Sequence, residues 1–196
     1  MQEPRYFHIY NRGASKDIVF QDDLDFVHFI RLINRYLGSR IVTNRYYRPY
    51  TNYRSRIRLH AYCLLNNHFH FVLEELEAGA MGRFMQSLKG AYCRSFNLRH
   101  NRTGVLFETK YQKREVGSTE DLMSVSRYVH LNAVAIQKDY ENYRYSSLKY
   151  YLYGGAPEWL YIDTIASLFK SPAEYLAFHE DGLRDIAIKA LDKIQV

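Results

Sequence analysis

Residues 57–75 read IRLHAYCLLNNHFHFVLEE, and this stretch decides the fold. It is apolar and rich in β-branched and aromatic residues, and two turn-forming asparagines interrupt it near its centre. Short apolar runs of this kind favour strands over helix. The pattern predicts one strand over about Ile57–Leu64, a tight link at Leu65–His68, and a second strand over about Phe69–Glu74.

The link and the second strand carry a pair of histidines, His68 and His70. Alternate residues of a strand point to the same face, so the two imidazoles lie on one side, roughly 6.6 Å apart along the chain. Two imidazoles at that spacing can bind one ion, because metal–nitrogen bonds are about 2.1 Å long. Phe69, between them, faces the opposite side and the core. An exposed polar face or a structural hydrogen-bond network would explain the same pair, so the pair alone leaves the metal open.

The composition favours an anionic partner. The chain has 196 residues, enough for one domain or one domain with an appendage, and its net charge is +6. It also contains 19 tyrosines, and aromatic rings mixed with basic side chains suit single-stranded nucleic acid, where bases stack and phosphates pair with Arg or Lys. An ordinary basic protein with tyrosine-rich packing would have the same composition.

The sequence shows no pattern of a secretory signal or of a membrane-spanning segment. The N-terminal residues show no apolar signal core, and no apolar run is long enough to span a bilayer. The two cysteines, Cys63 and Cys93, fall in a predicted strand and a predicted helix, and we expect both to be small buried hydrophobes in a reducing compartment. These features predict a cytoplasmic protein without a membrane partner.

The strongest charge feature is the segment Arg40–Arg58. It contains six arginines and four tyrosines, and no Asp or Glu occurs from Arg40 through Leu73. We expect a long loop or ribbon that contacts nucleic acid, although a solvated, flexible insertion would fit the same composition. The arginines predicted to contact DNA there are Arg45, Arg48, Arg54 and Arg56.

The remaining elements complete a recognisable order. Strand patterns at residues 6–10 and 109–116 and helical patterns at residues 22–37, 80–98 and 120–134 flank the two strands already described. The order βαββαβ predicts an α+β, ferredoxin-like or RRM-like antiparallel sheet, with the histidine strand central and the helices packed mainly on one face. Gly154–Pro157 marks a boundary, which predicts a main domain over residues 1–153 and a small helical extension over residues 154–196.

The last of these helices places Tyr128 and Asn132 one turn apart. Residues four apart share a helix face, so the two side chains can act together. His130 on the same helix is expected to be structural or exposed. Tyr128 is one of 19 tyrosines, most of which must simply pack, so its spacing alone is weak evidence.

Four segments together resemble a known family. They are Tyr-Asn-Arg-Gly at residues 10–13, AYCLLNNHFH at 61–70, YVHLN at 128–132, and Arg-Tyr-Ser-Ser at 144–147. In this order they resemble the IS200-like single-tyrosine transposases, and more closely the REP-associated branch, within the histidine-hydrophobe-histidine (HUH) nucleases. The resemblance covers roughly residues 5–150.

The resemblance implies a metal-dependent endonuclease and strand transferase that acts on single-stranded, often hairpin-forming DNA. His68 and His70 match the metal-binding pair, Tyr128 matches the nucleophile, and Asn132 stands where insertion-sequence relatives carry a glutamine that completes the metal site. The implied cofactor is Mg²⁺ or Mn²⁺, the implied intermediate is a 5′-phosphotyrosine, and such relatives are often homodimers. The chain departs from the family at Asn66, where proline is usual.

A second departure follows Asn132, where this chain has Ala-Val-Ala-Ile in place of Pro-Val-Arg-Ala-Gly, so the DNA contact from that arginine is missing. Two other functions remain open: a non-catalytic DNA- or RNA-binding protein on the same fold, and a metal-assisted hydrolase that uses water. Further basic residues predicted to contact DNA, where a solvated surface is the alternative, are Arg12, Lys110, Lys113, Arg114 and Arg127.

Overall fold

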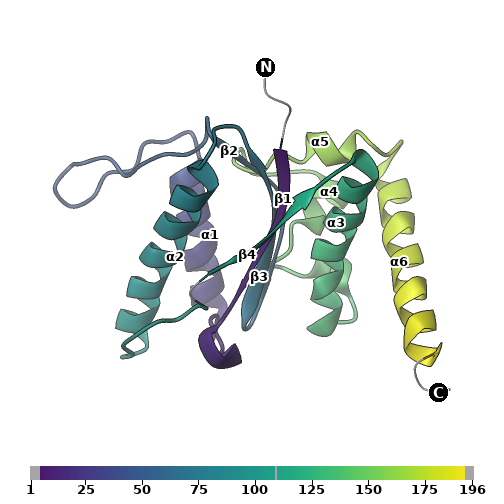
Figure 1. Cartoon of the computed structure of the whole chain (residues 1–196), viewed down its shortest axis with the longest axis horizontal. Helices are drawn as coiled ribbons and strands as arrows, with labels where there is room; N and C mark the ends of the chain where they lie inside the picture. The colour runs from purple at the N-terminus through teal and green to yellow at the C-terminus, as the bar shows by residue number, and fades with distance from the viewer. Residues whose placement is uncertain (1–4, 109, 193–196) are drawn as a thin grey trace.

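The structure is a computed structural model that describes residues 5–108 and 110–192, and its centre is a four-stranded antiparallel sheet (Figure 1). The strand order is β2-β3-β1-β4, so β1 and β3 occupy the two central positions. The histidine strand is therefore central, as predicted. The predicted strand from residue 109 begins at residue 112, and residue 109 lies outside the described residues. The strands are β1 (Arg5–Arg12), β2 (Ile57–Leu65), β3 (His68–Glu75) and β4 (Gln112–Val116).

The helices follow the strands in the predicted order, which confirms the α+β class and the βαββαβ plan. No helix among the described residues is both long and apolar enough to cross a membrane. Short 3-10 turns occupy Ala14–Lys16, Asn132–Ala135 and Tyr140–Asn142. The helices are α1 (Asp23–Leu37), α2 (Ala80–Arg99), α3 (Thr119–Leu131), α4 (Leu148–Tyr153), α5 (Asp163–Ala166) and α6 (Pro172–Asp192).

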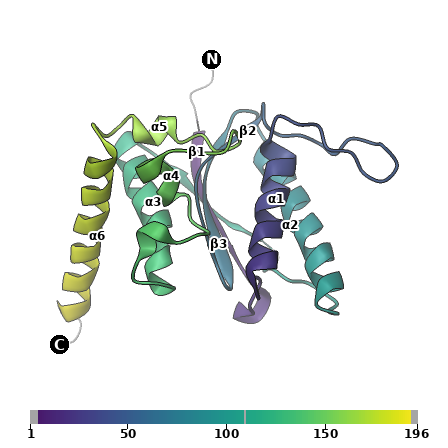
Figure 2. The same cartoon turned by 180° about the vertical axis from the view of Figure 1, so that it is seen from behind.

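The helices cover both faces of the sheet, which corrects the prediction that they pack mainly on one. Figures 1 and 2 show α1 and α2 on one side of the sheet, and α3, α4 and α6 on the other. Phe29 of α1 packs on Phe69 of β3, with ring centroids 5.3 Å apart. On the opposite face, His70 packs against Tyr128 of α3. The interior of β3 is buried throughout, and a strand buried on both faces needs a layer on each side.

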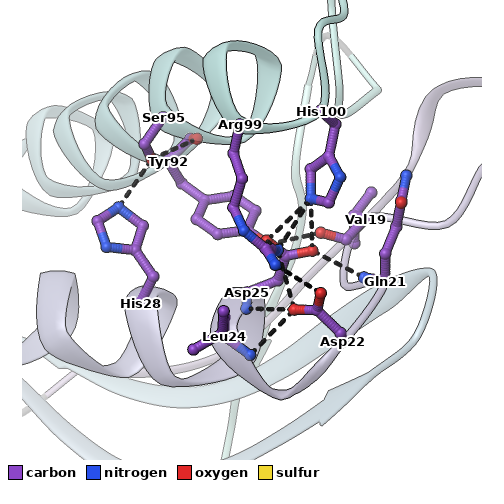
Figure 3. Close-up of polar contacts among 10 residues, drawn as sticks. All are labelled: Val19, Gln21, Asp22, Leu24, Asp25, His28, Tyr92, Ser95, Arg99 and His100. Atoms are coloured by element: carbon purple, nitrogen blue, oxygen red, sulfur yellow. Dashed lines mark hydrogen bonds and ion pairs between the residues drawn. The ribbon is translucent and has the colours of Figure 1, made fainter.

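A cluster of charged side chains ties the start of α1 to the end of α2 (Figure 3). Asp22 caps α1 by accepting hydrogen bonds from the backbone N–H groups of residues 24 and 25. The buried carboxylate of Asp25 accepts from Arg99 Nη1 at 2.7 Å and lies 2.9 Å from His100 Nε2. This cluster holds the start of α1 and the end of α2 together.

The C-terminal region packs closely on the main domain. Tyr161 N–H donates to the Leu59 carbonyl at 2.8 Å, alongside β2. The hydroxyl of Tyr175 on α6 donates to Ser126 Oγ of α3 at 3.1 Å. His130, also on α3, is fully buried between Ser147 and Tyr175, so it has the structural role expected for it. The division at residue 153 remains a prediction.

The two cysteines differ in burial. Cys63 is buried in β2, as predicted, whereas Cys93 on α2 is only half-buried. Both are free thiols. Cys93 lies at the rim of the α1–α2 layer, where the side chain donates weakly to the Gly104 carbonyl at 3.7 Å.

Candidate active site

The site is built around His68 and His70, which lie together on the face of the sheet covered by α3. Their ring centroids are 5.0 Å apart. The turn formed by Asn66 and Asn67 delivers His68 at the first position of β3, and pleating brings His70 to the same face. His70 is 4% exposed, whereas His68 is half-buried at the end of the strand. The structure therefore places the two rings as the strand pattern predicts.

Tyr128 reaches this pair from α3 of the same chain. Ser118 caps that helix by accepting from the Asp121 N–H at 3.1 Å, and Tyr128 follows in its third turn. The ring of Tyr128 stands edge-on to that of His70, with centroids 5.6 Å apart. The side chain is 52% exposed. The structure thus brings an accessible phenol beside the histidine pair without a second copy of the chain.

Hydrogen bonds fix the orientation of both histidine rings. His68 Nδ1 lies 2.6 Å from Asn67 Oδ1, and an amide oxygen only accepts, so this nitrogen carries the proton. The lone pair of His68 is consequently on Nε2. His70 Nδ1 lies 3.0 Å from Nε2 of a third histidine, His8. Metal-binding histidines characteristically have the second ring nitrogen held in this way.

Burial keeps the rings neutral. Burial is the main cause that lowers the pKa of His70 to about 3, and the charges of His68 and His8 lower it further. Burial also lowers the pKa of His68, with a smaller contribution from Arg12. Neutral imidazole is the form that binds a metal ion, so the pair is ready for a metal at neutral pH.

The donor set fits a divalent ion held by nitrogen and oxygen. Across the described part of the chain, no group of three or more His, Cys, Asp or Glu side chains is arranged to hold a metal. A metal at this site would be held by His68, His70 and an oxygen donor. Asn132 ends α3 one turn after Tyr128, and its amide nitrogen donates to the Tyr128 carbonyl at 2.7 Å. That bond uses only the amide nitrogen, and a role for the amide oxygen of Asn132 as a metal ligand stays a prediction. A set of two imidazoles with oxygen would suit Mn²⁺ better than Mg²⁺.

A pocket of about 360 Å³ opens beside Tyr128 and is lined by His8, Arg114, Asp121, Ser124, Val125 and Tyr128. Arg114 of β4 donates two hydrogen bonds of 2.9 Å to the Asp121 carboxylate. Arg12, at the end of β1, lies directly opposite His68 in the sheet. These two are the predicted DNA contacts that the structure brings to the site. Lys113 lies over the Phe7 ring on the other face of the sheet, with its amine 3.8 Å from the centroid.

The remaining predicted DNA contacts lie away from the site. Residues 38–56 form an arm that projects beyond α1 and α2 (Figure 1), as the long loop or ribbon predicted. Arg45 stacks on Tyr46 within this arm, its guanidinium carbon 4.7 Å from the ring centroid. At its base Arg54 donates to the Leu37 and Glu158 carbonyls, and Arg56 pairs with Glu77.

Three further predicted contacts have other surroundings. Arg48 bonds through its backbone N–H to Asn44 Oδ1 at 3.2 Å, within the arm. Lys110 is exposed, and its carbonyl accepts from Asn11 Nδ2 at 3.3 Å. Arg127 turns away from the site: it donates to the Phe178 carbonyl at 3.1 Å and lies over that ring, so it holds α6 against α3. A DNA role for each of these arginines and lysines stays a prediction.

The sequence analysis missed His8 as a member of the site. Its ring is stacked on that of His70 and lies edge-on to that of Tyr128, with centroids 5.2 and 5.4 Å apart. The alternating pattern of residues 6–10 already placed His8 on one face of a strand. The pattern could not show that this strand pairs with the histidine strand, β3, and this pairing brings His8 to His70.

Residues 44–132 match a family model described as "Transposase IS200 like". The match contains the histidine pair, Tyr128 and Asn132, and it confirms the resemblance seen in the sequence motifs: this part of the chain is similar to an IS200-like transposase. His8 and the rest of β1 lie outside the matched residues.

A solved structure shares the fold. It is described as "Structure of the REP associates tyrosine transposase bound to a REP hairpin". The two structures superpose with a TM-score of 0.53 at 13% sequence identity, over 80% of this chain and 84% of the other. At that identity the likeness concerns the fold. No curated protein matches the chain.

Proposed function

We propose that this protein cuts and rejoins single-stranded DNA, with Tyr128 as the nucleophile and a divalent ion held by His68 and His70. One observation carries the proposal: the Tyr128 ring lies 5.6 Å from the His70 ring within one chain. The similarity of residues 44–132 to IS200-like transposases supports DNA as the substrate, and the hairpin named for the solved relative supports a hairpin-forming strand.

The chain's own residues would act on one phosphodiester. The phenol oxygen of Tyr128 attacks the phosphorus in line, while the bond from phosphorus to the 3′ oxygen breaks. The products are a 5′-phosphotyrosine and a free 3′-hydroxyl: the phenol proton passes to solvent, and the departing 3′ oxygen takes up a proton from solvent. A bound Mn²⁺ or Mg²⁺ would supply charge stabilisation on the non-bridging oxygens. Because the phosphoester is retained, a second 3′-hydroxyl can reverse the step and join two strands.

The surroundings of Tyr128 suit a strand that enters from solvent. The adjoining pocket is lined by Arg114, which is paired with Asp121, and Arg12 stands across the sheet from His68. Arg side chains are well suited to phosphate groups. We infer that the nucleotides flanking the cut lie along this face, between β4 and α3. A homodimer remains a prediction, and the geometry supports a site completed by one chain.

The proposal is tested by looking for a covalent adduct between the protein and DNA. The protein is incubated with a library of hairpin-bearing single-stranded oligonucleotides and Mn²⁺ or Mg²⁺, and a denaturing gel is examined for a shifted band. We expect wild type to form the adduct and Tyr128→Phe to lose it, while binding of the oligonucleotide persists. Tyr153→Phe, which alters another exposed tyrosine, on α4, is the matched control and should retain the adduct.

The other outcomes point to the other functions. An adduct that persists in Tyr128→Phe contradicts the assignment of the nucleophile. Binding that needs no metal and never yields an adduct, with any strand, indicates a non-catalytic nucleic-acid-binding protein. Cleavage that releases a 5′-phosphate and survives the loss of Tyr128 indicates a hydrolase that uses water.

A further inference from the structure

His8 is a buried polar side chain that packs against both His70 and Tyr128. It is 7% exposed, and its Nε2 lies 3.0 Å from His70 Nδ1. The two rings are almost parallel, with an interplanar angle of 11°. The same His8 ring meets Tyr128 at 80°. One side chain therefore contacts both halves of the proposed site.

The sheet fixes His8 in this place. It lies on β1, opposite Val72 of β3 and opposite Arg114 of β4. Both pairings are antiparallel, and β1 is a central strand. His8 has paired backbone on both sides, so its position is as rigid as that of the histidines it supports.

The tautomer of His70 decides whether it can bind a metal through Nε2. If Nδ1 carries the proton, it donates to His8 Nε2 and leaves the lone pair of His70 on Nε2. If instead Nδ1 accepts from His8, the proton of His70 is on Nε2, which then cannot bind a metal. An acceptor at the position of His8 Nε2 selects the first arrangement, just as Asn67 Oδ1 does for His68.

We propose that His8 is a positioning residue: it accepts the hydrogen bond from His70 Nδ1–H, holds the metal-binding tautomer, and seats the Tyr128 ring beside the metal. This inference rests on the proposed function. It goes beyond the family match, which does not include β1.

The first measurement needs no activity. In metal-free wild-type protein with ¹⁵N-labelled histidine, the imidazole shifts report which nitrogen carries the proton. We expect His70 to be protonated at Nδ1 and unprotonated at Nε2. A His70 protonated at Nε2 would overturn the proposal in the wild-type protein itself.

The second measurement is the affinity for Mn²⁺ alone, determined from the electron paramagnetic resonance signal of free Mn²⁺. His8→Phe keeps an aromatic ring but removes the acceptor, and we expect 10- to 100-fold weaker Mn²⁺ binding, the usual effect of losing such a partner. His8→Gln restores an acceptor oxygen and should recover most of the affinity. Tyr6→Phe, two residues earlier on the same strand face, is the matched control and should bind Mn²⁺ as wild type does.

Two results would overturn the role of His8. One is wild-type Mn²⁺ affinity in His8→Phe. The other is an affinity in His8→Gln as poor as in His8→Phe, which would indicate that ring packing matters and the acceptor does not. The adduct assay separates this inference from the proposed function: a wild type that binds Mn²⁺ but never forms a Tyr128 adduct defeats the nuclease and leaves the His8 result standing. A wild type that binds no Mn²⁺ defeats both.

Discussion

Arg114 and Lys113 are neighbours on β4, yet their side chains lie on opposite faces of the sheet. Arg114 pairs across the sheet with His8 and lines the pocket beside Tyr128. Lys113 pairs with Ile9 and lies over the ring of Phe7. The strand pattern already placed them on opposite faces, whereas only the register shows which residues each face meets.

We expect Arg114→Gln to weaken binding of a single-stranded oligonucleotide and to flatten its salt dependence. Losing one phosphate contact to a single strand reduces the slope of log K against log salt by about 0.7. Lys113→Gln is the matched control, with the same loss of charge one residue away, and its slope should stay close to that of wild type. Fluorescence anisotropy at several salt concentrations measures both, and equal slopes for the two variants would refute the distinction.

At the scale of single residues, the site was predictable where one short segment carries it. His68 and His70 are two positions apart on one strand, so pleating alone predicts their common face. Tyr128 and Asn132 are one helical turn apart and follow in the same way. His8 is 62 positions from His70, and no local periodicity reports which strands pair or in what register.

The layer formed by α1 and α2 depends on one buried acid, Asp25 (Figure 3). Its side chain is 3% exposed and pairs with Arg99, which is 36% exposed. Asp23, two residues earlier, pairs with Arg144 at the open surface. The two acids share the first turn of the same helix, so they experience nearly the same helix dipole.

We expect Asp25→Asn to lower the free energy of unfolding by about 2 kcal/mol, because a charged hydrogen-bonded group is lost from a mostly buried cluster. Asp23→Asn should change it by less than about 0.5 kcal/mol, as is usual for exposed ion pairs. Urea unfolding followed by circular dichroism gives both values. Equal losses in the two variants would show that the helix dipole, and not the cluster, is responsible.

At the scale of elements, the order of strands and helices was predictable, but the number of layers was not. The periodicity of residues 80–98 and 120–134 indicates helices with apolar faces, and it is silent about which side of the sheet each helix covers. The near-continuous apolar run in β2 and β3 did carry the information. Strands that are apolar on both faces require a helical layer on each side.

The whole molecule contains several histidines that folding keeps neutral. Burial lowers the pKa of His8 and of His179 to about 4 in each case, and that of His70 to about 3. Burial also holds the pKa of His130 well below its ordinary value. In the unfolded chain each would titrate near 6.5.

The unfolded state therefore takes up protons at a higher pH than the folded state does. Stability from these groups is fully present above pH 6.5 and is lost as the pH falls towards 4. Carboxylates such as Asp121, whose pKa is lowered by the hydrogen bond from Arg114, lose their contribution only below about 3.8. The histidines thus govern the window between pH 6.5 and 4.

We expect the free energy of unfolding to fall steadily across that window, with His179 alone accounting for about 3 kcal/mol at about 1.4 kcal/mol per pKa unit. Urea unfolding at a series of pH values measures the decline. His179→Gln removes one titrating group. Near pH 5 its free energy of unfolding should therefore change less steeply with pH than that of wild type, by the slope that corresponds to about one proton, whatever its stability at pH 7. A curve parallel to that of wild type would contradict this account.

The proposed metal-binding histidines and the proposed nucleophile belong to different elements of the fold. His8, His68 and His70 belong to the two central strands, where interstrand pairing continues on either side. Tyr128 belongs to a helix that is held from behind by α6, through Arg127 and Tyr175. A shift of α3 by a single turn, about 5.4 Å, would separate Tyr128 from the histidines and leave the histidines in place. The packing of α6 against α3 is therefore what fixes the distance between Tyr128 and the histidines.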